Sequence, residues 1–433
     1  MTQKEALNLL KSGKNVFITG AAGTGKTYVL NQYVEYLREH EVEVAITAST
    51  GIAATHMNGV TIHSWSGIHL DQKITGETWR RIRKINGLAE GIRIAKVLII
   101  DEVSMLHHYR LDMVDQICRR VRQDQSPFGG LQVIMSGDFF QLPPVQGDGE
   151  PEAKFVVDSH VWNNMDLKIC YLTKQYRQDD QQFLHILGEI RDGKVSDNSK
   201  SLLESRLNKP VHLDLDIKIT QLYTTNRSVD GINNYELNQL NGKERQYLMA
   251  SKGVRDLVIK LKKGCMAPED LRLKVDAVVM FVRNNFGRGY VNGTLGKVIG
   301  FDKESGYPIV ETIHKKKVIA TPESWTVERQ GSVIAQISQV PLRLAWAITI
   351  HKSQGMSLDA ATIDLSKAFV EGMGYVALSR VRRLDGIKLL GINEMALKVH
   401  PDSIELDRNL QEQSQEVKGK LKILGKLKLS RQQ

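Results

Sequence analysis

Gly20-Ala21-Ala22-Gly23-Thr24-Gly25-Lys26-Thr27 is a glycine-rich stretch that directly follows the apolar run Val16-Phe17-Ile18-Thr19. A strand, a turn of this kind and then a helix form the arrangement that cradles the phosphates of a nucleotide. The glycines let successive backbone N–H groups face an anion, and the helix beginning near Thr24 adds the positive end of its dipole. Lys26 is expected to reach the β- and γ-phosphates, and the Thr27 hydroxyl to bind Mg²⁺. The stretch predicts a site for a nucleoside triphosphate.

A carboxylate pair, Asp101-Glu102, ends a second apolar run at residues 97–100. A short continuous apolar run is typical of a strand that is buried on both faces of a parallel sheet. An Asp at the tip of such a strand can hold Mg²⁺, and the adjacent Glu can polarise an attacking water. Surface carboxylate pairs are common, but this pair follows a strand and a glycine-rich loop, so we interpret it as catalytic.

The amino-acid composition limits which class of protein this chain can belong to. The chain has 433 residues, of which 41% are hydrophobic and 25% charged, which predicts a soluble protein of two or more domains. No stretch approaches the roughly 20 apolar residues that span a membrane, and no signal-peptide pattern is seen, so a cytoplasmic location is expected. The cysteines Cys118, Cys170 and Cys265 are far apart, which argues against a disulfide framework or a metal cluster.

The net charge of +10 indicates a polyanionic partner. Part of it lies in residues 401–433, a basic C-terminal tail in which six cations and no acid follow Glu416: Lys418, Lys420, Lys422, Lys426, Lys428 and Arg431. One interpretation is a flexible arm that adds salt-dependent contacts to nucleic-acid phosphates. The other is a disordered, solvated tail without a dedicated role.

Short apolar strands alternate with helical stretches in the first half of the chain. Strands are expected at residues 16–19, 42–47, 96–100 and 132–136, and a helix at 111–121, which is a βα pattern with a parallel sheet. The second half repeats this pattern, with strands expected at residues 217–223, 275–281, 361–365 and 387–390, but has no second loop of the Gly-Lys-Thr type. Because ligands of such sheets lie beyond the strand C-termini, the motifs after the strands are expected to converge there.

Further motifs carry cations, amides and hydroxyls. They are Gly137-Asp138-Phe139-Phe140-Gln141, Tyr176-Arg177-Gln178, Thr349-Ile350-His351-Lys352-Ser353-Gln354-Gly355 and Leu378-Ser379-Arg380. With Thr61-Ile62-His63-Ser64-Trp65 and Pro127-Phe128-Gly129-Gly130, the set resembles superfamily-one helicases of the 5′-to-3′ branch, specifically the Pif (petite integration frequency) family. The resemblance runs from about Gln3 to Leu390, and residues 110–130 look like the family's own signature segment. The chain is expected to lack the long N-terminal extension of eukaryotic relatives, and it looks like a bacterial or phage-type motor.

The resemblance implies an α/β fold of two RecA-like parallel-sheet domains with small insertions and the nucleotide between them. The first domain would comprise residues 1–68 and 94–170, and the second residues 171–301 and 341–400. Residues 69–93 look like a strand-separating wedge, and residues 302–340 like an SH3-like β insertion.

The same resemblance implies roles for the nucleotide-site residues. ATP would be bound by Gln3, Gly20, Ala21, Ala22, Gly23, Thr24, Gly25, Lys26, Thr27, Gln354 and Gly355. Mg²⁺ would be held by Thr27 and Asp101. Glu102 would be the base, Gln141 and Gln354 would sense the γ-phosphate, and Arg177 and Arg380 would neutralise charge in the transition state. Gln3 could instead be an exposed terminal residue, and either Arg a surface ion pair.

The DNA track is expected to use side chains suited to phosphate and sugar contacts, which carry no sequence information. These are Thr47, Thr50, Thr61, His63, Pro144, Asn292, His351 and Lys352. His63 has a structural alternative, because a lone His is often simply packed. Aromatic residues make up only 6% of the chain, so extensive base stacking is not indicated.

The activity implied is an ATP-dependent helicase that moves 5′ to 3′ on single-stranded DNA and unwinds duplex DNA, with quadruplex DNA as a further candidate substrate. Its partners would be single-stranded DNA and single-strand/duplex junctions. Two alternatives stay open: a translocase that does not unwind, and a nucleic-acid-binding module with a vestigial ATP site. Intact Lys26, Asp101 and Glu102 argue against the second.

Overall fold

The computed structural model describes residues 1–430, except residues 70, 86, 145, 147–149, 212–214, 216, 225–228, 286, 330 and 331. The side chains of residues 329 and 422–430 also lie outside the described part. The chain divides into two compact units, here considered one at a time. Unit 1 consists mainly of Met1–Tyr176 and His400–Gln433, and unit 2 of Arg177–Glu328 and Ser332–Val399.

Unit 1 is built on a six-stranded parallel sheet in the order β3-β2-β4-β5-β1-β6. Its strands are β1 (Val16–Thr19), β2 (Val44–Ala48), β3 (Val60–Thr61), β4 (Val97–Asp101), β5 (Gln132–Ser136) and β6 (Lys168–Tyr171). All five residues of β4 are buried, as its apolar run predicts. The four predicted strands are confirmed, and the strand C-termini place the glycine-rich loop and the Asp101-Glu102 pair at one edge.

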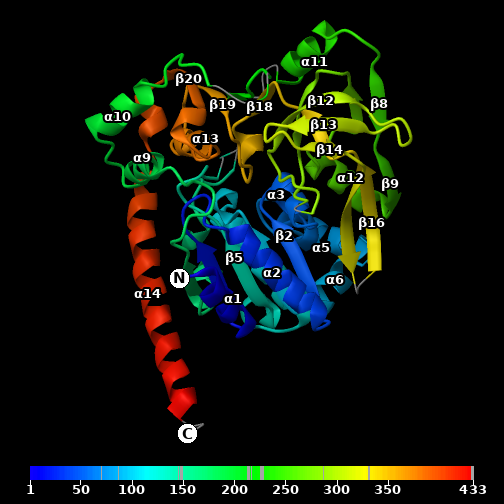
Figure 1. The fold of residues 1–433 in the computed structure, drawn as a ribbon. Helices are drawn as coiled ribbons and strands as arrows, with labels where there is room; N and C mark the ends of the chain where they lie inside the picture. The colour runs from blue at the N-terminus through cyan, green and yellow to red at the C-terminus, as the bar shows by residue number, and fades with distance from the viewer. Residues whose placement is uncertain are drawn as a thin grey trace. The chain divides into compact units, whose positions relative to one another are not determined.

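Helices cover both faces of this sheet. They are α1 (Gln3–Lys11), α2 (Lys26–Glu39), α3 (Gly51–His56), α4 (Ile62–Ser66), α5 (Gly76–Lys84), α6 (Leu88–Ile94), α7 (His108–Arg122) and α8 (His160–Asn164). Helices α1 and α2 lie together over one face (Figure 1) and share a core with Val16 and Ile18. On the other face, α7 packs in a core with Phe17 and Phe128. The predicted insertion at residues 69–93 contains α5 and α6, and its role as a wedge stays a prediction.

Unit 2 has its own four-stranded parallel sheet in the order β18-β7-β19-β20. The strands are β7 (Gln221–Tyr223), β18 (Ala347–Thr349), β19 (Ala361–Leu365) and β20 (Ile387–Ile392). The accompanying helices are α9 (Gln181–Arg191), α10 (Asp197–Glu204), α11 (Val229–Gln239) and α13 (Met373–Leu378). The expected strand at 275–281 is present as β11 (Val278–Phe281), but its place in the parallel pattern was wrong. It pairs antiparallel with two neighbours.

The rest of unit 2 is antiparallel. Five strands form the sheet β14-β13-β12-β11-β17, three form β15-β16-β9 and two form β10-β8. Besides β11 they are β8 (Arg245–Leu248), β9 (Ala250–Gly253), β10 (Asp270–Leu273), β12 (Leu295–Phe301), β13 (Pro308–Thr312), β14 (Lys317–Ile319), β15 (Glu323–Arg329), β16 (Ser332–Gln339) and β17 (Leu342–Leu344), with helix α12 (Arg255–Gly264). Antiparallel strands thus run from Arg245 to Leu344, a wider range than the 302–340 insertion predicted.

The C-terminal tail is a 30-residue helix, α14 (Pro401–Ser430). The prediction of a flexible or disordered tail is therefore wrong for these residues. Its face packs on unit 1 as far as Leu421, while the side chains of Lys422, Lys426 and Lys428, and residue Arg431, lie outside the described residues. Within the described residues, none of the helices combines the length and apolar character needed to cross a bilayer.

Candidate nucleotide site and DNA track

The glycine-rich loop joins the end of β1 to the start of α2. Lys26 is the first residue of α2, and its Nζ donates hydrogen bonds to Gly20 O at 2.8 Å and Ala21 O at 3.2 Å. The loop is tightened from within, because Thr24 Oγ1 also donates to Ala21 O at 2.9 Å. The ammonium is thereby held over the loop at the positive end of a 14-residue helix, which is a ready anion site.

Two positions of the loop favour glycine, Gly20 because the backbone of Leu172 approaches it and Gly25 because of its backbone conformation. A Cβ at Gly20 would lie 2.4 Å from Leu172 O, and one at Gly25 would lie 2.2 Å from Gln3 Nε2. Gly25 also has a φ of +84°, which favours glycine. The Gln3 amide donates to Thr24 O at 3.2 Å, so Gln3 lies against the loop, and its contact with the nucleotide stays a prediction.

The carboxylate pair follows β4 at the same sheet edge. Ser136 Oγ and the Glu102 N–H both donate to Asp101 Oδ1, the latter at 2.9 Å. Burial raises the pKa of the Asp101 carboxyl, while these hydrogen bonds and the charge of Lys26 act in the opposite direction. Glu102 has a φ of +53°, a left-handed conformation that is uncommon for a non-glycine residue and costs free energy.

The donors near the loop suit Mg²⁺. Thr27 follows Lys26 in the first turn of α2, and Asp101 interacts electrostatically with Lys26. Among the described residues, no group of three or more His, Cys, Asp or Glu side chains could hold a metal ion. One hydroxyl and one carboxylate fit an ion that keeps several waters and takes the remaining ligands from phosphates.

Gln141 follows β5 in the third motif. Its side chain is 4% exposed, and its Oε1 accepts no hydrogen bond within the described part of the chain. The backbone fixes its position, because Gln141 N donates to Asp138 O at 3.0 Å and Phe140 N to Asp138 Oδ1 at 3.2 Å. A buried amide oxygen without a partner is costly in a fold, so this one is available to a ligand. Gln354 Nε2 in unit 2 is likewise buried without a partner in the described chain.

The two predicted arginines come together within unit 2. Arg177 Nη1 donates to Ser379 O at 3.0 Å, and Arg380 Nη2 donates to Ser379 Oγ at 2.9 Å. Arg380 Nε also donates to Val376 O at 2.9 Å, which fixes the guanidinium at the end of α13. Gln178 was assigned no role from the sequence. Its side-chain amide donates a hydrogen bond to the same Ser379 O at 2.9 Å.

The threonines predicted on the DNA track of unit 1 fall into two classes. Thr50 and Thr61 cap α3 and α4, each accepting a backbone N–H with its hydroxyl at 3.2 Å, and both are half-buried. Thr47 is 1% exposed and donates its hydroxyl across the sheet to Ile99 O at 2.6 Å. The Thr47 hydroxyl is therefore used inside the sheet, and a contact of Thr47 with DNA stays a prediction. Pro144 is buried in the described structure.

His63 lies in α4 beside a cluster that sequence reasoning missed. Burial lowers the pKa of its imidazole to about 4, and the nearby charges of Arg110, His107 and His69 act in the same direction. Arg110 Nη2 is paired with Glu150 Oε1 at 2.6 Å. At neutral pH, His63 therefore offers a neutral imidazole to any ligand.

The unit 2 candidates sit at strand ends. His351 and Lys352 directly follow β18 in a short 3₁₀ helix, and Lys352 N donates to Thr349 Oγ1 at 3.2 Å. Burial lowers the pKa of His351. Asn292 is 6% exposed, and its N–H donates to Asn284 Oδ1 at 2.8 Å. Ligands of parallel sheets bind beyond the C-termini of the strands. His351 and Lys352 lie in such a position, whereas Asn292 does not.

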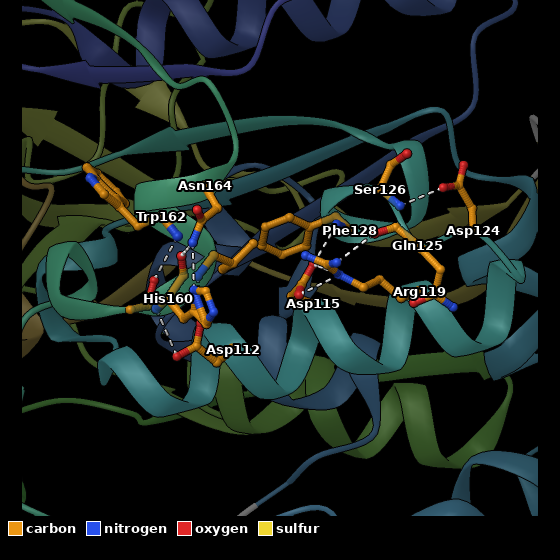
Figure 2. A network of polar contacts seen from close by, with 12 residues as sticks. Asp112, Asp115, Arg119, Asp124, Gln125, Ser126, Phe128, His160, Trp162 and Asn164 are labelled. Atoms are coloured by element: carbon orange, nitrogen blue, oxygen red, sulfur yellow. Dashed lines mark hydrogen bonds and ion pairs between the residues drawn. The ribbon is translucent and has the colours of Figure 1, made fainter.

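The segment at residues 110–130 is organised by α7 (Figure 2). Asp115 accepts hydrogen bonds from Phe128 N at 2.6 Å and from Arg119 Nε at 2.8 Å, while Arg119 Nη1 donates to Gln125 O at 2.6 Å. Phe128 is fully buried with a φ of +52°, so the Asp115 contact holds an unfavourable turn. Asp115, Arg119 and Phe128 therefore have a structural role. No motif in the sequence predicts that Asp115 accepts a hydrogen bond from Phe128 N.

The same helix also holds the insertion at residues 69–93. The Arg120 guanidinium lies 4.4 Å from the centre of the Trp79 ring, a cation–π contact. Arg122 Nη1 donates to Ile92 O at 3.0 Å and to Ala95 O at 2.8 Å, at the end of α6. The insertion is therefore fastened to the sheet of unit 1 by α7.

Comparison with known proteins places these features in a family. The model of the family described as PIF1-like helicase matches residues 2–201, and that of the DNA helicase Pif1 2B domain matches residues 256–301. An ATP-dependent DNA helicase Pif1 of Psychrobacter sp. is 43% identical over 93% of this chain, and the human ATP-dependent DNA helicase PIF1 is 37% identical over 92% of it. The chain spans 69% of the former and 62% of the latter.

Solved structures agree. Unliganded Pif1 from Bacteroides sp. is similar with a TM-score of 0.80 and 31% identity, covering 94% of this chain and 96% of that one. Bacteroides Pif1 in complex with ADP-AlF3 and ssDNA is similar with a TM-score of 0.63 and 30% identity, covering 95% and 96%. The two parallel-sheet units are accordingly RecA-like domains, and the chain belongs to the PIF1-like helicase family.

Proposed function

We propose that this chain is an ATP-dependent DNA helicase that translocates 5′ to 3′ on single-stranded DNA and unwinds duplex DNA. The observation that carries the proposal is the single sheet edge of unit 1 that presents Lys26, the Asp101-Glu102 pair and Gln141 together. Relatives named ATP-dependent DNA helicases, and a relative solved with ADP-AlF3 and ssDNA, support the choice of ATP and DNA.

The proposed chemistry assigns one task to each group. Lys26 and the backbone N–H groups of the loop bind the phosphates, and Thr27 and Asp101 hold Mg²⁺. The ion, when bound, neutralises charge on the phosphate oxygens. Glu102 orients and deprotonates the attacking water. Gln141 and Gln354 use their free amide atoms to detect the γ-phosphate.

Arg177 and Arg380 are proposed to stabilise the charge that develops on the transferred phosphoryl group. Their shared anchor, Ser379, positions both guanidinium groups from one point of unit 2. Guanidinium groups suit this task because they stay charged and present several N–H donors in a fixed plane.

The DNA contacts are proposed to include Thr50, Thr61, His63, Pro144, Asn292, His351 and Lys352. Because burial lowers the pKa of His63 and His351, both are neutral at pH 7.5 and release no counterion when they meet a phosphate. We expect Lys352→Ala to reduce the slope of log K for single-stranded DNA against log salt by about 0.7. His63→Ala and His351→Ala should weaken binding and leave that slope unchanged. A smaller slope in either His variant, measured by fluorescence anisotropy across a salt series, would show that the imidazole binds DNA in its charged form.

The direction of movement is tested by unwinding. With ATP and Mg²⁺, we expect strand separation from a duplex with a 5′ single-stranded tail and none from the same duplex with a 3′ tail. The physical basis is a motor that grips one strand through sugar and phosphate contacts, which are polar along the strand. A gel or stopped-flow fluorescence assay with matched sequences measures both substrates. Efficient unwinding from the 3′ tail contradicts the proposed polarity, and ATP hydrolysis stimulated by DNA without any unwinding makes the protein a translocase.

A further inference from the structure

Helix α14 contacts unit 1 through one regular face. The residues of this face are Ser403, Asp407, Leu410, Ser414, Val417 and Leu421, with alternating spacings of four and three. Leu410 packs in the core that contains Phe17 and Phe139, while Val417 and Leu421 pack in the core on the other side of the sheet. The helix, labelled α14 in Figure 1, therefore covers the edge of the sheet along β6, its last strand.

The first turn of α14 is fixed to the Gln141 motif. Ser403 Oγ donates a hydrogen bond of 2.8 Å to Phe139 O, and Ser403 is fully buried. The Phe139 and Phe155 ring centroids are 5.2 Å apart, and the His400 ring centroid is 5.4 Å from that of Phe155. Two residues beyond Phe139 stands Gln141, whose Oε1 is buried without a hydrogen bond in the described chain.

The middle of α14 is fixed to the strand behind the glycine-rich loop. Tyr171 OH donates to both carboxylate oxygens of Asp407, at 3.0 and 3.1 Å, and Tyr171 N donates to Ser414 Oγ at 2.9 Å. The next residue, Leu172, places its carbonyl so close to Gly20 that a Cβ there would lie 2.4 Å away. A shift of β6 at this point would therefore reach the first glycine of the loop.

A third contact lies near the start of α1. Lys418 Nζ is 3.4 Å from Glu5 Oε2, and its charge contributes to lowering the pKa of Glu5, which mainly accepts the Thr2 N–H. The same helix carries Gln3, whose amide bonds to Thr24 O. This ion pair is half-exposed and weak by itself, but it lies on the same face of α14 as the two buried contacts.

We propose that α14 is a positioning element for ATP hydrolysis, acting through Ser403 on Gln141 and through Asp407 and Ser414 on the glycine-rich loop. The chain passes from unit 2 to unit 1 between Val399 and His400, three residues before Ser403. One of the covalent connections between the units therefore leads into the contact that Ser403 makes with Phe139. The inference rests on the proposed γ-phosphate-sensing role of Gln141.

The test compares full-length variants in DNA-stimulated ATP hydrolysis. Loss of one hydrogen bond that positions a catalytic group is expected to lower kcat about fivefold in Ser403→Ala. KM for ATP and the Kd for single-stranded DNA should stay at parental values. Ser403→Thr retains the hydroxyl and should restore kcat. Gln413→Ala, at an exposed position of the same helix, is the matched control and should behave as the parent.

Tyr171→Phe provides a second variant at an independent contact, since it removes the hydroxyl that donates to Asp407 and keeps the ring. It should also lower kcat at unchanged KM. A reduced melting temperature with parental kcat in both variants would overturn the proposal, because α14 would then be only structural. Gln141→Ala distinguishes a failure of the proposed Gln141 role from a failure of the α14 proposal. If Gln141→Ala leaves kcat unchanged, the proposed role of Gln141 is wrong. If Gln141→Ala lowers kcat while Ser403→Ala has the parental kcat, only the proposed role of α14 is wrong.

Discussion

Glu102→Gln is expected to lower kcat for ATP hydrolysis by roughly 10²- to 10⁴-fold, the range for loss of a general base. Glu102 stands directly after Asp101 at the tip of a fully buried strand, and its left-handed backbone fixes where the side chain leaves the sheet. The Gln side chain has nearly the same shape, so Lys26, Thr27 and Asp101 keep their geometry. ATP binding should therefore survive, and the variant should trap the bound nucleotide.

Lys26→Ala is the companion change. It removes the ammonium that bonds to Gly20 O and Ala21 O, so both phosphate binding and the shape of the loop are affected. We expect a rate loss of at least about 10²- to 10³-fold, as for loss of a donor to a developing charge, together with weaker ATP binding. Phosphate release and titration with a fluorescent ATP analogue separate the two variants. Glu405→Gln on the exposed side of α14 is the control for the charge change, and parental turnover in Glu102→Gln would exclude Glu102 as the base.

The local parts of this site are predictable from the sequence because each motif encodes its own geometry. The loop favours glycine at Gly20, where Leu172 O approaches the backbone, and at Gly25, where φ is +84°, and the buried strands before the loop and before Asp101 are continuous apolar runs. Parallel strands then bring the motifs to one edge without further information. The convergence of Lys26 and Asp101 follows from that rule alone.

Long-range partners could not be predicted. The contact face of α14 is half polar, with Ser403, Asp407 and Ser414, so the segment reads as a solvated basic tail although it is docked. The strand β11 is an apolar run that has the same pattern in a parallel or an antiparallel sheet. Thr47 looks like an exposed hydroxyl donor, but its carbonyl partner lies 52 residues away on β4. In each case the deciding interaction joins residues that are distant in sequence.

Arg177→Ala and Arg380→Ala are each expected to lower kcat by about 10³-fold or more, as for arginines that stabilise a transferring phosphoryl group. KM for ATP should change far less, because these contacts strengthen only as charge spreads over the phosphoryl oxygens. The two variants should differ in stability. Arg380 is 1% exposed and donates to Val376 O and Ser379 Oγ, so its truncation removes buried packing together with two buried hydrogen bonds, whereas Arg177 is half-buried and donates to Ser379 O.

A melting curve is therefore measured beside the kinetics of each variant. Arg→Lys at both positions keeps the charge but loses the planar array of N–H donors, and we expect it to recover only part of the rate. Arg383→Ala is the matched control, because Arg383 is exposed and forms an ion pair with the exposed Asp385 at 3.4 Å. Equal losses in kcat and in ATP affinity would show that the arginine already contacts the phosphate of bound ATP in the ground state. Parental kinetics with a lowered melting temperature would make Arg380 a structural residue of α13, and would leave Arg177 as the single arginine able to act on the transition state from Ser379.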